Sequence, residues 1–171
     1  MSGRSQNGFT LIELLVVVSI IGVLSAIAIP GLIRGRMAGN EASAIGSLRA
    51  INSAEADYAS VAGGGGYAIA LATLAAPCPG ASLGFISPDL QTDPSLKSGY
   101  TVSLADTTVG TPSNVVDDCN GTKSRSGFYA NAVPLTIGTT GTRGFATSAA
   151  GTISVTKTGA APPETGGMPL Q

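Results

Sequence analysis

The chain contains no histidine and no tryptophan, and only two cysteines among its 171 residues. Without histidine, a Ser-His-Asp or Cys-His site is impossible, so the nucleophilic catalysis that depends on an imidazole base is excluded. Two cysteines with no histidine also make a poor zinc site. The remaining carboxylates have no recognisable partners for acid-base chemistry, and we therefore expect the chain not to be an enzyme.

Charge is scarce as well. Charged residues make up 11% of the chain and the formal net charge is −1, with no basic cluster, so the composition does not indicate nucleic-acid binding. The glycine run 63–66 lacks the Lys and Ser/Thr that complete a phosphate-binding loop. The segment 117–120 could offer oxygen ligands to calcium, but acidic turns are common. We predict no cofactor and no metal.

What the chain does have is a long apolar run near its beginning. From Leu14 to Ile33 there is no charged residue, and a helix of that length spans roughly 30 Å, the thickness of a bilayer's hydrocarbon core. One acid, Glu13, stands just before the run. The segment is too long for a secretory signal peptide and no small-x-small cleavage site follows it. A plain membrane anchor has no use for Glu13, because a carboxylate in a membrane is costly unless something pairs with it.

The residues around Glu13 resemble a known processing signal. Gly8-Phe9-Thr10-Leu11-Ile12-Glu13 resembles the class III signal of type IV pilins and type II secretion pseudopilins, and the likeness extends over residues 8–30. The resemblance implies a leader peptide, residues 1–8 with Arg4 as its charge, that a prepilin peptidase removes after Gly8. It also implies that the same enzyme N-methylates Phe9, and that Glu13 pairs with the Phe9 amine of a neighbouring subunit during assembly.

Beyond the membrane the helix is predicted to continue. Apolar residues recur every three or four positions, the period of one helical face: Ile45, Leu48, Ile51, Ala54 and Tyr58. We divide the helix into a transmembrane and assembly part, residues 9–33, and an amphipathic continuation, residues 34–62. Gly22 and Pro30 weaken a helix. The resemblance implies local flexibility between them, while a simple proline kink is the alternative.

A β-rich domain is predicted to follow, over residues 63–156. The glycine run 63–66 ends the helix, and a joining loop extends from residue 77 to residue 99. Four segments read as strands: 99–104, 128–133, 143–147 and 152–156. The fold class is therefore α+β, a long N-terminal helix packed on a small antiparallel sheet, as in the pilin fold. The last residues, 157–171, are rich in Pro and Gly and are expected to form a flexible tail.

The two cysteines, Cys78 and Cys119, are predicted to form a disulfide if this domain lies outside the cytoplasm. The bond would join the loop between helix and sheet to the loop between the first two strands. Two free buried thiols are the alternative.

Taken with the resemblance, these features predict a structural subunit, the major pilin precursor of a type IV pilus. Its expected partners are copies of itself, the prepilin peptidase, an assembly platform in the inner membrane, and membrane lipid before assembly. The expected location is the bacterial inner membrane, with the β-rich domain outside the cytoplasm, and then the extracellular pilus. The orientation comes from the resemblance, because positive charges are balanced on the two sides of the span. A type II secretion pseudopilin, a minor pilin or adhesin, and an anchor that never polymerises remain alternatives.

Overall fold

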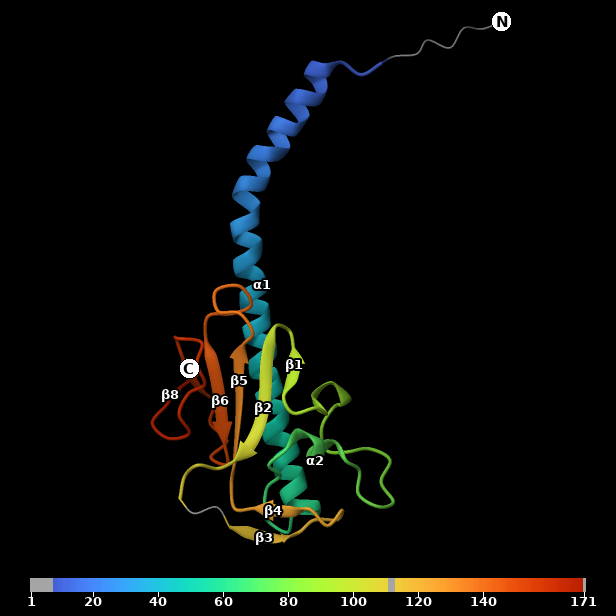
Figure 1. Cartoon of the computed structure of the whole chain (residues 1–171), viewed down its shortest axis with the longest axis vertical. Coiled ribbons are helices and arrows are strands. Elements are labelled where there is room, and N and C mark those ends of the chain that lie inside the picture. The colour runs from blue at the N-terminus through green and yellow to red at the C-terminus, as the bar shows by residue number, and fades with distance from the viewer. Residues whose placement is uncertain (1–7, 111–112, 171) are drawn as a thin grey trace, which may run out of the picture. The chain divides into compact units, whose positions relative to one another are not determined.

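The computed structural model describes residues 8–110 and 113–170 (Figure 1). The chain divides into two units, Met1–Arg36 and Met37–Gln171, which we call the N-terminal and the C-terminal unit. The arrangement is α+β, as the sequence predicts, with one long apolar helix at the N-terminus and an antiparallel sheet.

The long helix α1 comprises Leu11–Val61 and contributes its second part to the C-terminal unit. There one face is buried, through Ala44, Leu48, Ile51, Ala54 and Tyr58. Their spacing of three or four residues is that of a single helical stripe, and four of the five belong to the predicted stripe. The helix ends as the glycine run begins. Because the backbone turns into the left-handed region at Gly64, with φ of +56°, the helix cannot continue.

The main sheet has six antiparallel strands in the order β1-β2-β5-β6-β7-β8. Its strands are β1 Ser95–Lys97, β2 Tyr100–Asp106, β5 Phe128–Pro134, β6 Gly144–Ser148, β7 Ser154–Thr156 and β8 Met168–Pro169. The predicted strands correspond to β2, β5, β6 and β7. The turn between β6 and β7 closes with the Gly151 amide donating to the Ser148 carbonyl at 2.8 Å.

The core of the C-terminal unit forms where the buried stripe of α1 meets one face of this sheet (Figure 1). Buried and partly exposed residues alternate along β2, so Tyr100, Val102 and Leu104 point to the core. Tyr100 and Phe145 bring their rings together with centroids 6.1 Å apart. Because this packing removes several large apolar side chains from water, it is the main stabilising contribution in this unit.

The segment between α1 and the sheet contains the short helices α2, Leu71–Ala75, and η1, Pro88–Leu90. Between β2 and β5 lies a second, two-stranded sheet, β3 Asn114–Asp117 and β4 Lys123–Arg125. From the sequence, this region is expected to be a loop. β3 is exposed throughout, so it lacks the alternation of apolar and polar residues that reveals a strand.

Cys78 and Cys119 form the predicted disulfide, with Cα atoms 5.5 Å apart. It joins the segment after α2 to the turn between β3 and β4. The adjacent Asp118 carboxylate accepts a hydrogen bond from the Tyr58 hydroxyl at 2.9 Å, and its other oxygen accepts from the amides of Asn120 and Thr122. This carboxylate therefore stabilises the turn and fixes it to α1.

The segment after residue 157 differs from the predicted flexible tail. Its last residues form β8, which pairs with β7, and the Leu170 amide donates to the Ile153 carbonyl at 2.8 Å. Glu164 accepts hydrogen bonds from Thr107 and Thr108. Composition alone suggests flexibility, but these specific partners hold the segment against the sheet.

Two carboxylates of α1 are buried in the C-terminal unit. Glu41 is 6% exposed and bonds to Thr142 and Arg143, including an ion pair of 2.7 Å to the guanidinium. Burial raises the pKa of Glu41, but these hydrogen bonds and the positive charge outweigh it and leave the pKa lowered. Glu55 is fully buried. Its Oε2 accepts from the Ala68 amide at 2.9 Å, while Oε1 has no hydrogen-bond partner among the described residues.

Candidate assembly segment

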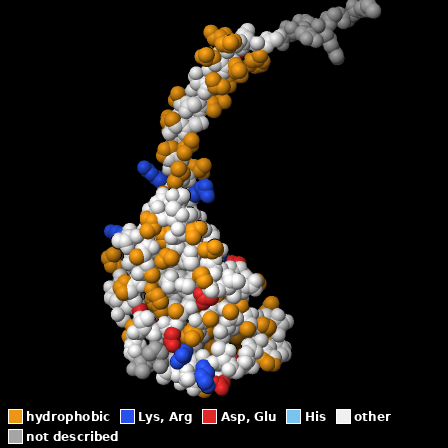
Figure 2. Space-filling view, in the orientation of Figure 1, with side chains coloured by type: hydrophobic (Ala, Val, Ile, Leu, Met, Phe, Trp, Pro, Cys, Tyr) orange, Lys and Arg blue, Asp and Glu red, His pale blue; other side chains and the backbone are white. Residues whose placement is uncertain are grey.

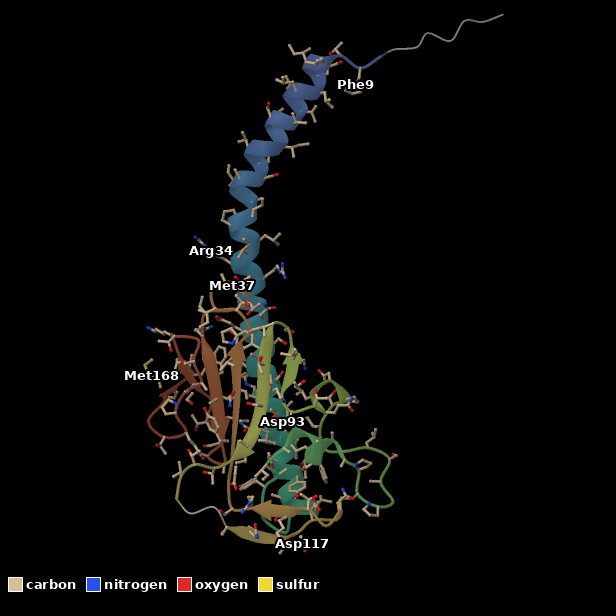
Figure 3. The ribbon with its side chains drawn as sticks, in the orientation of Figure 1. Phe9, Arg34, Met37, Asp93, Asp117 and Met168 are labelled. Carbon is tan, nitrogen blue, oxygen red and sulfur yellow. A yellow bond between two sulfur atoms is a disulfide. The ribbon has the colours of Figure 1, made fainter. Side chains whose placement is uncertain are left out.

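Phe9 and Glu13 lie together at the start of the N-terminal unit. Phe9 precedes the first turn of α1 and is 84% exposed (Figure 3). It lines a shallow surface groove with Ile12, Glu13, Val16 and Val17. The groove is apolar except for the Glu13 carboxylate. Phe9, whose amine is implied in assembly, and Glu13, the acid implied to pair with it, therefore lie on one surface.

Thr10 holds Glu13 in place. The Glu13 amide donates to Thr10 Oγ1 at 3.3 Å, while the Thr10 amide and hydroxyl donate to Glu13 Oε2 at 2.9 and 2.6 Å. This reciprocal arrangement is a capping box, which satisfies amide groups that the first turn of a helix leaves free. Thr10 is not among the predicted site residues, although the Thr-x-x-Glu spacing is the signature of this cap.

Apolar side chains cover the helix that follows. Every Leu, Ile and Val from Leu11 to Ile33 is exposed, from 44% at Ile33 to 81% at Leu11 (Figure 2). Within the described residues, α1 is the one helix long and apolar enough to cross a membrane by length and composition. The exposed apolar surface requires an apolar environment from outside the chain.

The helix passes through both of its weak points without interruption. Gly22 has no neighbouring atom where a side chain would stand, and Pro30 lies within α1. The Ser19 hydroxyl donates to the Leu15 carbonyl at 2.8 Å, so the helix itself satisfies this polar group. A helix that satisfies its own backbone is one of the few structures that can cross a bilayer.

The other predicted sites are distributed as follows. Gly8 is described next to Phe9, whereas residues 1–7 of the predicted leader, Arg4 included, lie outside the described residues. In the described part of the chain, no group of three or more acidic, Cys or His side chains could hold a metal ion. The disulfide cysteines belong to the C-terminal unit and are not part of the assembly segment.

One comparison with known proteins concerns this same segment. Residues 3–29 match the family model of the prokaryotic N-terminal methylation motif. The chain is also 45% identical, over 53 residues, to the type IV major pilin protein PilA of Myxococcus xanthus (strain DK1622). That match covers 31% of this chain and 24% of PilA. No solved structure is significantly similar to the chain. The N-terminal segment of the chain therefore matches a prokaryotic N-terminal methylation motif, and part of the chain is similar to a type IV major pilin.

Proposed function

We propose that this chain is the precursor of the major structural subunit of a type IV pilus. A prepilin peptidase cuts it between Gly8 and Phe9 and methylates the new terminus, and the mature subunit polymerises through α1. The observation that carries the proposal is the exposed apolar helix with Phe9 and Glu13 on one surface at its start. The rest of the chain folds separately around its own core.

The same apolar surface serves two successive environments. In the inner membrane, lipid chains cover the residues from Leu14 to Ile33. In the fibre, the equivalent helices of neighbouring subunits cover them. Since both environments are apolar, transfer from one to the other need not expose the helix to water. Gly22 and Pro30 are the positions at which we expect the helix to yield under tension, because both weaken it.

Glu13 provides the polar contact that fixes the register of subunits. Cleavage after Gly8 creates a positively charged amine at Phe9, which is the natural partner for a carboxylate in an apolar environment. An incoming subunit whose Phe9 amine reaches the Glu13 of its neighbour neutralises both charges. A subunit at any other axial offset leaves both charges unpaired, so the pair selects one offset.

The similarity to PilA favours a pilus subunit over a secretion pseudopilin. The methylation motif itself is compatible with both, and with a minor pilin. We propose the inner membrane as the location of the precursor, with its C-terminal unit outside the cytoplasm, and an assembly platform there as the partner that transfers subunits into the fibre. The proposal gives the chain a structural role and no enzymatic one.

Glu13→Ala tests the role of this acid, and Asp57→Ala is its control, since Asp57 is another exposed acid of α1. In cells that assemble the fibre, the Glu13→Ala subunit should be cleaved normally but absent from sheared fibres. The Asp57→Ala subunit should be incorporated like the wild type. Normal incorporation of the Glu13→Ala subunit would contradict the pairing.

A further inference from the structure

Two arginines follow the apolar run of the N-terminal unit directly. Arg34 and Arg36 are both exposed, and no hydrogen bond or ion pair joins either side chain to another described residue. The nearest acid before them in sequence is Glu13, at the opposite end of the apolar run, and the nearest after them is Glu41, whose carboxylate already accepts bonds from Thr142 and Arg143. The two guanidinium groups therefore lack an anion within the described chain.

Their spacing places them on opposite sides of the helix. Residues two apart in an α-helix are separated by about 200° around its axis. Figure 2 shows basic side chains on both sides of α1 just after the apolar stretch, and Figure 3 labels Arg34 as one of them. A protein partner that docks on one side of the helix would satisfy one arginine. A partner that surrounds the helix would satisfy both.

We propose that Arg34 and Arg36 bind the phosphate groups of anionic phospholipids at the membrane surface where α1 leaves the bilayer. A leaflet surrounds a helix on all sides and presents phosphates at the level where its hydrocarbon core ends. Guanidinium groups match phosphate oxygens in a two-bonded geometry, and long arginine side chains reach the interface from a helix end. The lipid contact fixes how deeply the helix is inserted before assembly. This inference rests on the proposed function only in taking Leu14–Ile33 as the membrane span.

A fluorescence experiment on the full chain in bilayers tests the inference. Because the chain has no Trp, Leu32→Trp introduces a single selectively excited fluorophore near both arginines. Leu32 is 66% exposed on the N-terminal unit, so nearby lipid can quench the new indole. Bilayers of phosphatidylcholine and phosphatidylglycerol are prepared with bromine on the chains of one lipid or the other. Comparing the quenching gives the preference for anionic lipid, whichever way the protein is inserted.

We expect the indole to prefer phosphatidylglycerol, by up to about five-fold for each arginine. The preference should fall in ~1 M salt, where the Debye length is about 3 Å. Arg34→Gln with Arg36→Gln should abolish it. Arg49→Gln with Lys157→Gln is the charge-matched control, since both residues are exposed in the C-terminal unit, and it should leave the preference unchanged.

Equal quenching by the two lipids, or a preference that survives the loss of both arginines, would overturn the inference. So would displacement of the lipid by inorganic phosphate at constant ionic strength, because the arginines would then be a site for free phosphate. If loss of the arginines blocks fibre assembly while lipid preference is absent, they contact a neighbouring subunit instead. Failure of the membrane assignment is recognised separately, because no brominated lipid would then quench the indole.

Discussion

We expect the free energy of unfolding of the C-terminal unit to fall as the pH rises from about 5 to about 8, because of Glu55. Replacing Glu55 with glutamine should abolish this fall. Burial raises the pKa of Glu55 from 4.5 to about 8, and the hydrogen bond from the Ala68 amide only partly opposes this. In that range the unfolded chain has an ionised Glu55, while the folded chain keeps it protonated. The folded state then binds more protons, so stability falls as pH rises.

The size of the effect follows from the two pKa values. The difference between 4.5 and about 8 corresponds to on the order of 5 kcal/mol over the whole range, with a slope of at most about 1.4 kcal/mol per pH unit. Other titratable groups contribute little to the pH dependence of stability between about pH 5 and 8. The chain has no histidine, the pKa values of Glu41 and Glu164 are lowered, and those of the neighbouring Tyr58 and of Tyr100 are raised.

Chemical denaturation of the full chain in mild detergent, followed by tyrosine circular dichroism at a series of pH values, measures this slope. Glutamine keeps the acceptor for the Ala68 amide but carries no charge, so Glu55→Gln should make the curve nearly flat between about pH 5 and 8. Glu164→Gln is the control and should change the curve only in acid. A wild-type curve that is flat over this range, or a slope that Glu55→Gln leaves intact, would refute the reasoning.

Three further predictions concern the C-terminal unit. Glu41→Gln should lower the free energy of unfolding at neutral pH by about 1 to 2 kcal/mol, a modest loss because water partly screens the half-exposed Arg143. In denaturation curves the difference from wild type should vanish as the pH falls through the lowered pKa of Glu41. The double change Cys78→Ser and Cys119→Ser opens a loop of sequence separation 41. In the chain-entropy model it should lower the free energy of unfolding by about 4 kcal/mol. An unchanged denaturation midpoint would contradict this. Leu48→Ala removes a fully buried side chain and should cost about 2 to 5 kcal/mol, whereas Leu83→Ala, at an 80% exposed position, should have little effect in the same assay.

Periodic features of the sequence predict much of this fold. The apolar run Leu14–Ile33 contains no charged residue, and the stripe from Leu48 to Tyr58 has the helical period, so together they predict most of α1. Strands β2 and β5 alternate buried and partly exposed residues along their length. These features are local in the chain, and a pattern within ten to twenty residues is enough to detect them.

Contacts between distant residues are not visible in such patterns. Glu41 resembles a solvated acid until the fold brings Thr142 and Arg143 beside it, about a hundred positions later. Glu55 resembles one too, although it is fully buried. The tail appears flexible by composition because its partners, such as Thr108 for Glu164, lie far away in sequence. Thr10 is different, since its cap with Glu13 is local and a search for capping boxes would have found it.

The most direct test of the central claim is the mass of the N-terminal peptide of this protein in fibres sheared from cells. The proposed function predicts an abundant species that begins at Phe9 and carries one added methyl group. A chain in the sheared fraction that still begins at Met1 would contradict processing at Gly8. A methylated Phe9 confined to the cell envelope would contradict the role of major pilus subunit.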